Sequence, residues 1–451
     1  MGSTKTTLPA LSENTILRYF NFIALYFAQG IPEGMLFFGI PAWMAMNGKS
    51  AGEIASFAIA CGLPWSFKFI VAPLMDRYTI LSMGRKRPWV IFGQLGLMTS
   101  FILMAFIPDP LNNLDTFMLA GFIVSFFGAF QDVATDGMAV DIIPPDEQAR
   151  ANGFMWGSKI IGTSASLALG SWLLNQYSYT VSIASLSGLV GTIMLVPIFL
   201  RERPGEKTMP WTAGTASLEN KQLQLTNWKA IFKSLYSVFK LKNSLLLAII
   251  GFLIAGSINY MDILLPIFTV KELGWTDLTY SQVFATTSVV GGIGGMLIGG
   301  LLVDKFGKKR MLNIYFFVWI ASTVALVFMK SFWANTIFIN GYMFAYSTLS
   351  VFCNIGLFAI AMQCCWKKVS ASQFTLYMTI SNIGRIAFAA LIPPMKANFS
   401  WEITLLGFAG IVLVSWVLLQ FLNIKLFVKN VEKLENKDIE RRGMLRPIIE
   451  V

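Results

Sequence analysis

Long apolar runs separated by short polar segments make up most of the chain. A membrane-spanning helix needs about 20 mostly apolar residues, and twelve runs meet this requirement. They are 18–44, 54–75, 89–107, 116–140, 151–174, 180–200, 244–270, 280–303, 311–329, 334–361, 372–395 and 401–428. Because six runs lie on each side of a polar segment, 201–243, the pattern predicts an all-α membrane protein of twelve transmembrane helices in two six-helix pseudo-repeats.

This polar segment divides the chain into four expected regions. They are a six-helix bundle at 1–200, a cytoplasmic linker at 201–243, a second six-helix bundle at 244–428 and a cytoplasmic tail at 429–451. Within the linker, apolar residues recur at helical spacing between lysines, from Trp228 to Lys240. That spacing predicts an amphipathic helix on the membrane surface, which could be a passive linker or an element that regulates the protein or binds a partner.

The distribution of Lys and Arg supports the count of twelve spans. If alternate loops face opposite sides, one side receives the clusters 77–87 and 305–310, the linker and the tail. The other side receives only Lys49, Lys271, Lys330 and Lys396. Because cytoplasmic loops carry the excess of Lys and Arg, we expect both termini to lie in the cytoplasm and the protein to be integral to the plasma membrane. The polar residues 1–14 lack the pattern of a cleaved signal peptide.

Composition narrows the class of protein further. Of 451 residues, 55% are hydrophobic and 13% charged, whereas soluble domains carry about 25% charged residues, so the lipid bilayer must solvate much of the surface. The net charge of +11 is explained by topology and does not indicate nucleic acid. The four cysteines form no disulfide framework, and we expect no cofactor or metal. The chain contains no His, so proton transfer must use carboxylates.

A charged loop motif occurs twice. After the eighth run the chain reads Gly300-Leu-Leu-Val-Asp304-Lys305-Phe-Gly307-Lys308-Lys309-Arg310; after the second it reads Leu74-Met-Asp76-Arg77, six further residues and Gly84-Arg85-Lys86-Arg87. Copies at corresponding positions indicate homologous halves. A carboxylate at a helix end can pair with cations or cap a neighbouring helix N-terminus, and the glycine permits a tight turn. We expect a latch that holds one conformation closed; the alternative is a cluster of topogenic positive charge.

These loops resemble the signature loop of the major facilitator superfamily, and the six-plus-six layout extends the resemblance over the whole chain. The insertion 78–83 resembles the peptide/acetyl-coenzyme A transporter branch, which includes muropeptide permeases, as do Gln131-Asp132-Val-Ala-Thr-Asp136 continuing to Asp141 and Gln29-Gly30-Ile31-Pro32. The resemblance implies a monomeric, proton-coupled transporter that alternates its access between the two sides and carries a muropeptide. Acetyl-coenzyme A, a siderophore or another bulky organic anion is the alternative solute.

Seven charged residues fall inside the expected spans, away from helix ends. They are Glu33, Lys68, Asp132, Asp136, Lys159, Asp262 and Arg385. Each would cost roughly 2.5–3.5 kcal/mol at the bilayer centre, so they must face one another or a water-filled cavity. The cations indicate a solute with anionic groups.

Asp132 and Asp136 lie four residues apart, so both carboxylates project from one helix face. Two acids close together favour holding one proton between them, which makes them the expected proton-coupling site. Lys159 lies at a similar depth, roughly 13 Å from the joining loop by helical rise, and is expected to pair with them. A static ion pair that fixes helix packing is the alternative.

The other intramembrane charges have less decided roles. Glu33 lies between Pro32 and Gly34, where a loosened helix can bind a ligand or a proton. Arg385 lies mid-span and is expected to function, Asp262 lies nearer the outer surface, and Lys68 is close enough to the cytoplasmic end to snorkel. A membrane-embedded transferase or a channel is less favoured, because the loops are short, His is absent and a duplicated latch fits alternating access.

Overall fold

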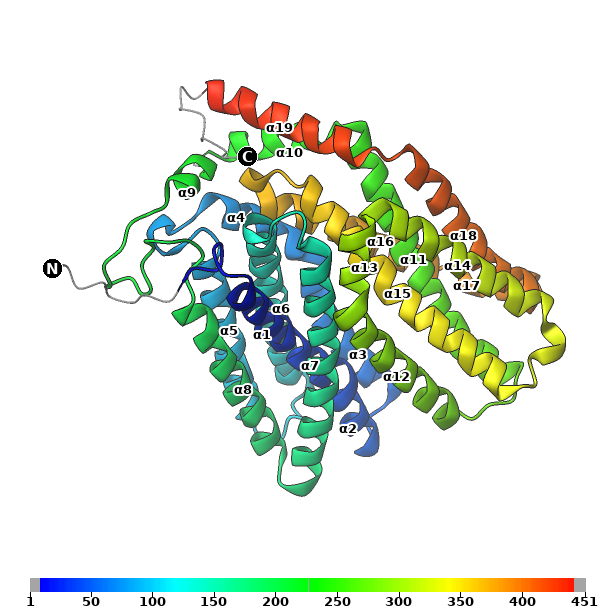
Figure 1. Cartoon of the computed structure of the whole chain (residues 1–451). Helices are drawn as coiled ribbons and strands as arrows, with labels where there is room; N and C mark the ends of the chain where they lie inside the picture. The colour runs from blue at the N-terminus through cyan, green and yellow to red at the C-terminus, as the bar shows by residue number, and fades with distance from the viewer. Residues whose placement is uncertain (1–8, 226, 442–451) are drawn as a thin grey trace.

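Helices form the regular structure of residues 9–225 and 227–441, the parts of the chain that the computed structural model describes. Figure 1 shows two neighbouring helical bundles, one built from the first part of the chain and one from the second. We call them the N-half (spans one to six) and the C-half (spans seven to twelve).

The N-half contains six spans, two of which are interrupted. The first consists of α1 (Thr15–Gly34), a π-helical turn (Met35–Gly39) and α2 (Ile40–Met46); the second consists of α3 (Ala51–Phe67), a 3-10 turn (Lys68–Ile70) and α4 (Ala72–Arg77). The others are α5 (Arg87–Ala105), α6 (Leu114–Ile142), α7 (Gln148–Gln176) and α8 (Tyr179–Phe199). The π-turn follows Pro32, which lacks the N–H that would continue the helical ladder.

The linker contains α9 (Leu218–Leu223) and α10 (Trp228–Phe239). The C-half begins with α11 (Lys242–Lys271), then α12 (Asp277–Gly294), a π-turn (Gly295–Gly299) and α13 (Gly300–Phe306) as one span. It continues with α14 (Lys308–Phe328), α15 (Thr336–Cys364), α16 (Ser370–Ala389) with α17 (Ile392–Asn398), and α18 (Trp401–Phe421), before the tail helix α19 (Ile424–Arg441). The predicted twelve-helix, two-repeat architecture is confirmed.

Two spans, α7 and α18, differ from what the apolar runs of the sequence indicate. Eleven described spans are long and apolar enough to cross a membrane on composition alone, and α7 is not among them. It contains glycines, serines and Lys159, and it packs between α1 and the C-half helices α13 and α15. At the chain's end the helix breaks inside the expected run 401–428, since α18 ends at Phe421 and α19 starts at Ile424.

Glycines bring corresponding helices of each half into backbone contact. A Cβ at Gly30 of α1 would lie 2.4 Å from the carbonyl oxygen of Lys159 in α7, and one at Gly162 would lie 2.3 Å from that of Phe27. In the C-half, a Cβ at Gly384 of α16 would lie 2.1 Å from the carbonyl oxygen of Phe252 in α11. These approaches bring α1 and α7, and α11 and α16, close enough for their intramembrane charges to interact.

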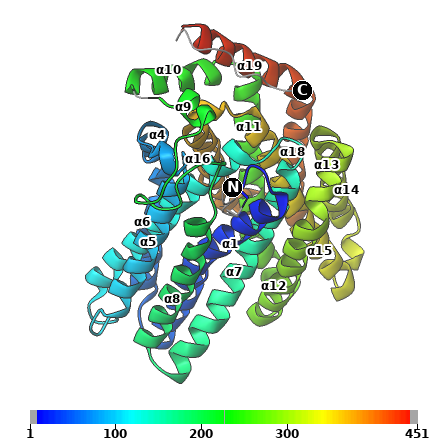
Figure 2. The ribbon, with the colours of Figure 1, turned by 60° about the vertical axis from the view of Figure 1, so that its left-hand side comes forward.

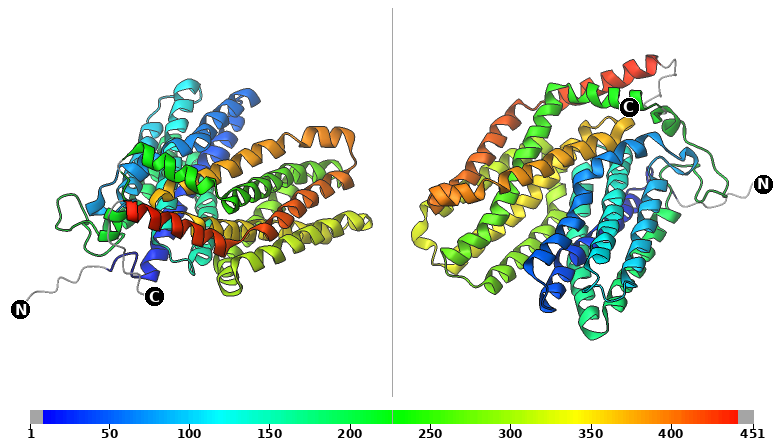
Figure 3. Two further views of the ribbon diagram at one scale, coloured as in Figure 1. Left: turned by 90° about the horizontal axis from the view of Figure 1, so that it is seen from above. Right: turned by 180° about the vertical axis from the view of Figure 1, so that it is seen from behind.

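The two halves meet along α7, which packs on α12 and α13, and along α16, which packs on α4 and α6. Close contact is again through glycine: a Cβ at Gly153 would lie 2.7 Å from the carbonyl oxygen of Gly295. The end of the bundle that carries the loops 78–86 and 365–369 also carries α9, α10 and α19 (Figures 2 and 3). We call it the linker end.

The helix α10 lies across the seam at the linker end. Its first residue, Trp228, makes a cation–π contact with Arg77 of the N-half, whose guanidinium carbon lies 4.6 Å from the ring centroid, and packs edge-on against Tyr78. Its last residue, Phe239, packs on Tyr377 of α16 in the C-half, with ring centroids 5.2 Å apart. One short helix therefore contacts both halves.

Candidate functional site

The first layer of the site is the pair of predicted latch loops at the linker end. Asp76 is fully buried and accepts hydrogen bonds from the backbone N–H of Ser372 (2.9 Å) and from its hydroxyl (2.6 Å), at the N-terminus of α16. Lys86 donates to the same carboxylate, and a guanidinium nitrogen of Arg85 lies 3.7 Å from it. An N-half carboxylate thus caps a C-half helix, where the helix dipole favours negative charge.

The second loop repeats this contact in the opposite sense. Asp304 accepts from the backbone N–H groups of Ala149 (3.2 Å) and Arg150 (3.0 Å) at the N-terminus of α7. Gly300 allows the approach, because a Cβ there would lie 2.5 Å from the carbonyl oxygen of Ala149. Lys305 is exposed beside Phe306.

The residue after each loop glycine reaches across the seam. Arg85 donates to the backbone carbonyls of Lys367 and Lys368 in the C-half, while Lys308 donates at 2.9 Å to the carbonyl of Pro145 in the N-half. The two halves are therefore joined at the linker end by four related contacts, two in each direction.

Acceptors at equivalent helix ends hold these cations. Asp141, next to last in α6, accepts from Arg85 at 2.8 Å, and Gln363, next to last in α15, accepts from Lys308 at 2.9 Å. The N-half copy is thus an ion pair, whereas in the C-half copy the cation donates to a neutral amide. Removing Arg85 would leave the buried carboxylate of Asp141 without its cation, whereas removing Lys308 would leave only a neutral amide unpaired, which costs less.

The linker braces the first loop. Glu202 is fully buried and accepts from the backbone N–H groups of residues 85–87, two of them at 2.7 Å, which caps the start of α5. The loop glycines Gly84 and Gly307 have φ of +111° and +91°, a region that favours glycine. Nearby, burial and the neighbouring Glu202 raise the pKa of Glu206 to about 8.

The second layer is a buried charge cluster inside the N-half. Lys68 is 2% exposed and pairs with Asp132 at 2.6 Å. Asp136, one turn further along α6, accepts from the hydroxyl of Tyr26 in α1. Its other oxygen, Oδ2, is buried with no hydrogen-bond partner among the described residues. Gln131 donates to Thr135 and to the backbone of α1.

Lys159 pairs with a different acid from the one expected. Its amino group lies 3.1 Å from Glu33 of α1, across the glycine contact between α1 and α7, rather than beside Asp132 or Asp136. The snorkelling interpretation of Lys68 is also wrong, because α3 ends at Phe67 and a 3-10 turn carries Lys68 inward to Asp132. Depth counted along a helix gives the height of a side chain but not the side of the helix on which it lies.

The third layer is a pair of cavities that meet at Arg385. The larger, about 220 Å³, lies between α7 of the N-half and α11, α12, α15 and α16 of the C-half. The smaller, about 70 Å³, lies among α11, α15 and α16. Trp156, Asn354 and Arg385 line both cavities. Their shared wall places Arg385 at the junction.

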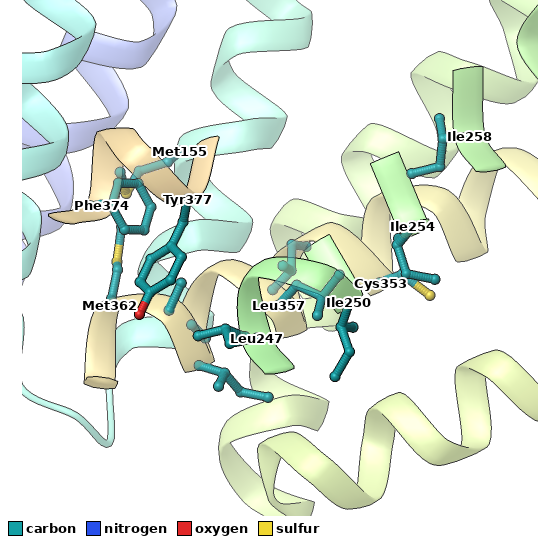
Figure 4. Close-up of a cluster of buried hydrophobic side chains, with 14 of the residues drawn as sticks. Met155, Leu247, Ile250, Ile254, Ile258, Cys353, Leu357, Met362, Phe374 and Tyr377 are labelled. Atoms are coloured by element: carbon teal, nitrogen blue, oxygen red, sulfur yellow. The ribbon is translucent and has the colours of Figure 1, made fainter. Parts of the chain in front are cut away.

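The smaller cavity has an apolar wall that Figure 4 displays. Leu247 and Ile254 of α11, Leu357 of α15, and Phe374 and Tyr377 of α16 contribute to it. Among the described residues, the half-buried guanidinium of Arg385 has no hydrogen bond or ion pair. Such a cation faces an aqueous cavity or a bound anion.

Several members of the site were not predicted. Tyr26 and Glu202 are single polar residues whose partners are distant in sequence, so no local pattern singled them out. Trp156 was detectable, because it lies three residues before Lys159 and helical spacing places both on one face; the amino group lies 5.3 Å from the ring centroid. The described residues contain no group of three or more acids or cysteines that could hold a metal ion.

Comparison with known proteins identifies the family and the fold. A family model of the Major Facilitator Superfamily matches residues 22–389. The anhydromuropeptide permease of Escherichia coli (strain K12) is 25% identical over 376 residues, covering 81% of this chain and 71% of that protein. The putative transporter AmpG 4 of Rickettsia conorii is 22% identical over 437 residues, covering 91% and 98%. The solved structure of the transporter FucP in the outward conformation matches with a TM-score of 0.67 at 14% identity, covering 90% and 99%.

Proposed function

Since the chain belongs to the major facilitator superfamily, and is therefore a multi-pass membrane transporter and not an enzyme, we propose that it couples proton movement to the transport of a bulky anionic solute. A peptidoglycan-derived muropeptide is the solute class that we put first. Support comes from the anhydromuropeptide permease of Escherichia coli, which aligns with 81% of this chain. Acetyl-coenzyme A, a siderophore or another organic anion remains the second candidate.

The observation that carries the proposal is the unpartnered guanidinium of Arg385 at the cavity between the halves. A charge near the bilayer centre costs roughly 2.5–3.5 kcal/mol or more, and no carboxylate among the described residues pairs with it. A solute carboxylate in the cavity would supply the missing partner. Trp156, which lines both cavities, offers an aromatic face to the rest of the solute.

Proton binding is assigned to the buried cluster of the N-half. Asp132 has Lys68 as its counter-ion, whereas Asp136 has only the Tyr26 hydroxyl among its described contacts. Burying a carboxylate without a cation costs more than burying the neutral acid, so Asp136 is the carboxyl that holds the proton in this conformation. Asp132, Glu33 and Lys159 modulate it through their charges.

Orientation follows from the loops. The linker end carries the clusters 77–87 and 305–310 and the linker itself, so it faces the cytoplasm of a bacterial inner-membrane transporter acting as a monomer. The latch contacts of Asp76 and Asp304 then close the cytoplasmic side. Alternating access requires these contacts to break while the cavity opens inward.

The test is uptake of radiolabelled anhydromuropeptide into proteoliposomes, with and without a proton gradient. Arg385→Gln should abolish uptake, and Arg385→Lys should keep part of it. Asp136→Asn should lose gradient-driven accumulation but keep exchange of solute at equilibrium. Ser381→Ala, which alters the lining of the smaller cavity without changing charge, is the matched control. Wild-type accumulation by both Arg385→Gln and Asp136→Asn would overturn these assignments.

A further inference from the structure

Asp262 and Arg385 bring opposite charges to the same cavity without pairing with each other. They come from the adjacent helices α11 and α16, and both line the cavity of about 220 Å³. Asn259, one turn before Asp262, donates at 2.9 Å to the backbone carbonyl of Arg385 and fixes the two helices at this level. Yet the described ion pairs include no contact between the carboxylate and the guanidinium.

Each of the two charges is short of partners. The hydroxyl of Tyr346 lies 2.7 Å from Asp262 and 2.9 Å from the carbonyl oxygen of Ile258, so its single hydrogen is shared between two acceptors. An ionised carboxylate can accept about four hydrogen bonds, which leaves Asp262 most of its capacity. No group among residues 9–225 and 227–441 accepts a hydrogen bond from the guanidinium of Arg385, which retains all five of its N–H donors toward these residues. Protein contacts therefore leave both groups available to a ligand.

The rest of the cavity suits a compact polar group. Ser288, Ser347, Ser350 and Asn354 supply neutral donors and acceptors around the two charges. The smaller cavity, of about 70 Å³ and with a largely apolar lining, opens beside Arg385. The polar and apolar compartments thus meet at the guanidinium.

Building on the proposed function, we propose that this cavity recognises a zwitterion: an ammonium group of the solute binds Asp262 while a carboxylate binds Arg385. A small apolar substituent next to the carboxylate enters the smaller cavity. Substrates of this class are peptides, or conjugates that end in an amino acid with both charges free. A ligand with a carboxylate but no ammonium group would leave Asp262 without a cationic partner, and a ligand with an ammonium group but no carboxylate would leave Arg385 without an anionic partner.

The experiment measures binding of three probes to the full-length protein in detergent micelles, by the shift of the thermal unfolding midpoint. The probes are alanyl-alanine, its N-acetyl derivative and its C-terminal amide. For wild-type protein, blocking either charge should weaken binding by about tenfold or more, since each block removes one charge-assisted contact. Asp262→Asn should bind alanyl-alanine and its N-acetyl derivative equally. Arg385→Gln should bind alanyl-alanine and its amide equally.

Asp115→Asn, which removes an exposed carboxylate at the start of α6 and outside this cavity, is the control and should discriminate like the wild type. Equal binding of the three probes to wild-type protein, or no binding of any of them, would overturn the zwitterion site. Continued discrimination against N-acetylation by Asp262→Asn would do so too. Anhydromuropeptide uptake in proteoliposomes is scored separately, so a transporter that carries muropeptide but ignores the amine refutes this inference and leaves the proposed function standing.

Discussion

The two latch aspartates should differ in how strongly they hold the linker end closed. We consider Asp76→Asn and Asp304→Asn, which keep the shape of the side chain and remove its charge. Asp76 is fully buried with Lys86, and their ion pair lies in the seam with Ser372. Asp304 contacts mainly backbone N–H groups of α7, and the nearest nitrogen of the Arg150 guanidinium is 3.8 Å away.

The expected magnitudes follow from these partners. Breaking a buried ion pair by removing one member costs about 3–5 kcal/mol, and Arg85 can retain Asp141 while Lys86 loses its carboxylate. Losing the charge in hydrogen bonds to backbone donors costs about 1.5–3 kcal/mol. Lys86 lies in the same half as Asp76, so this cost falls on the closed state because water can solvate the unpaired Lys86 once the seam opens. At about 1.4 kcal/mol per tenfold, the first substitution then shifts the closed-to-open equilibrium roughly a hundredfold or more. The second shifts it roughly 10- to 100-fold.

Double electron–electron resonance between spin labels at Ile80 and Phe306 would measure this shift. Both residues are exposed and lie at the linker end in opposite halves, so labelling leaves the core intact. Wild-type protein should give one short distance, and Asp76→Asn should move more of the population to longer distances than Asp304→Asn. A larger effect of Asp304→Asn, or no effect of either change on the distances, would refute the reasoning from burial and ion pairing.

Three further outcomes are expected. Lys68→Met and Asp132→Asn should each lower the thermal unfolding midpoint, because each strands a buried charge, and the double variant should recover much of the loss; additive losses would contradict a direct pair. Burial and Glu202 raise the pKa of Glu206 from an ordinary 4.5 to about 8, so between these pH values the folded state binds more protons than the unfolded state. The free energy of unfolding should therefore fall as pH rises through this window, and Glu206→Gln should flatten that slope in thermal melts. An unchanged slope would assign the pH dependence to other groups. Trp228→Ala removes a cation–π contact of about 0.5–1 kcal/mol and should open the labelled pair slightly, whereas Trp211→Ala, an exposed linker tryptophan, should not.

The fold was largely readable from the sequence because lipid imposes a strong constraint on it. A span must be about 20 apolar residues long, and the basic loops report which ends lie together. Even so, α7 is not apolar enough to count as a span by composition alone, although the run 151–174 was among the twelve expected spans and the alternation of basic loops supported it. The break between Phe421 and Ile424 contains a single polar residue, Asn423, which accepts from the backbone N–H of Leu426, and one such residue does not end an apolar run in a hydropathy pattern.

The candidate site was predicted as a set of residues but not as a set of pairs. The cost of intramembrane charge singled out Lys68, Lys159 and Arg385. Which acid each cation contacts depends on helix rotation and on glycine contacts such as Gly30 against α7, and these are tertiary properties. The sequence therefore predicted Lys159 to pair with Asp132 and Asp136, whereas its partner is Glu33.

The position of α10 separates two kinds of connection between the halves. The peptide chain joins them through the linker, but Trp228 on Arg77 and Phe239 on Tyr377 join them by surface contact. A cut in the segment between Pro210 and Ser217 would break the first connection and leave the second in place. We therefore expect two separately synthesised half-proteins, the second beginning at α9, to assemble through these contacts without a covalent linker.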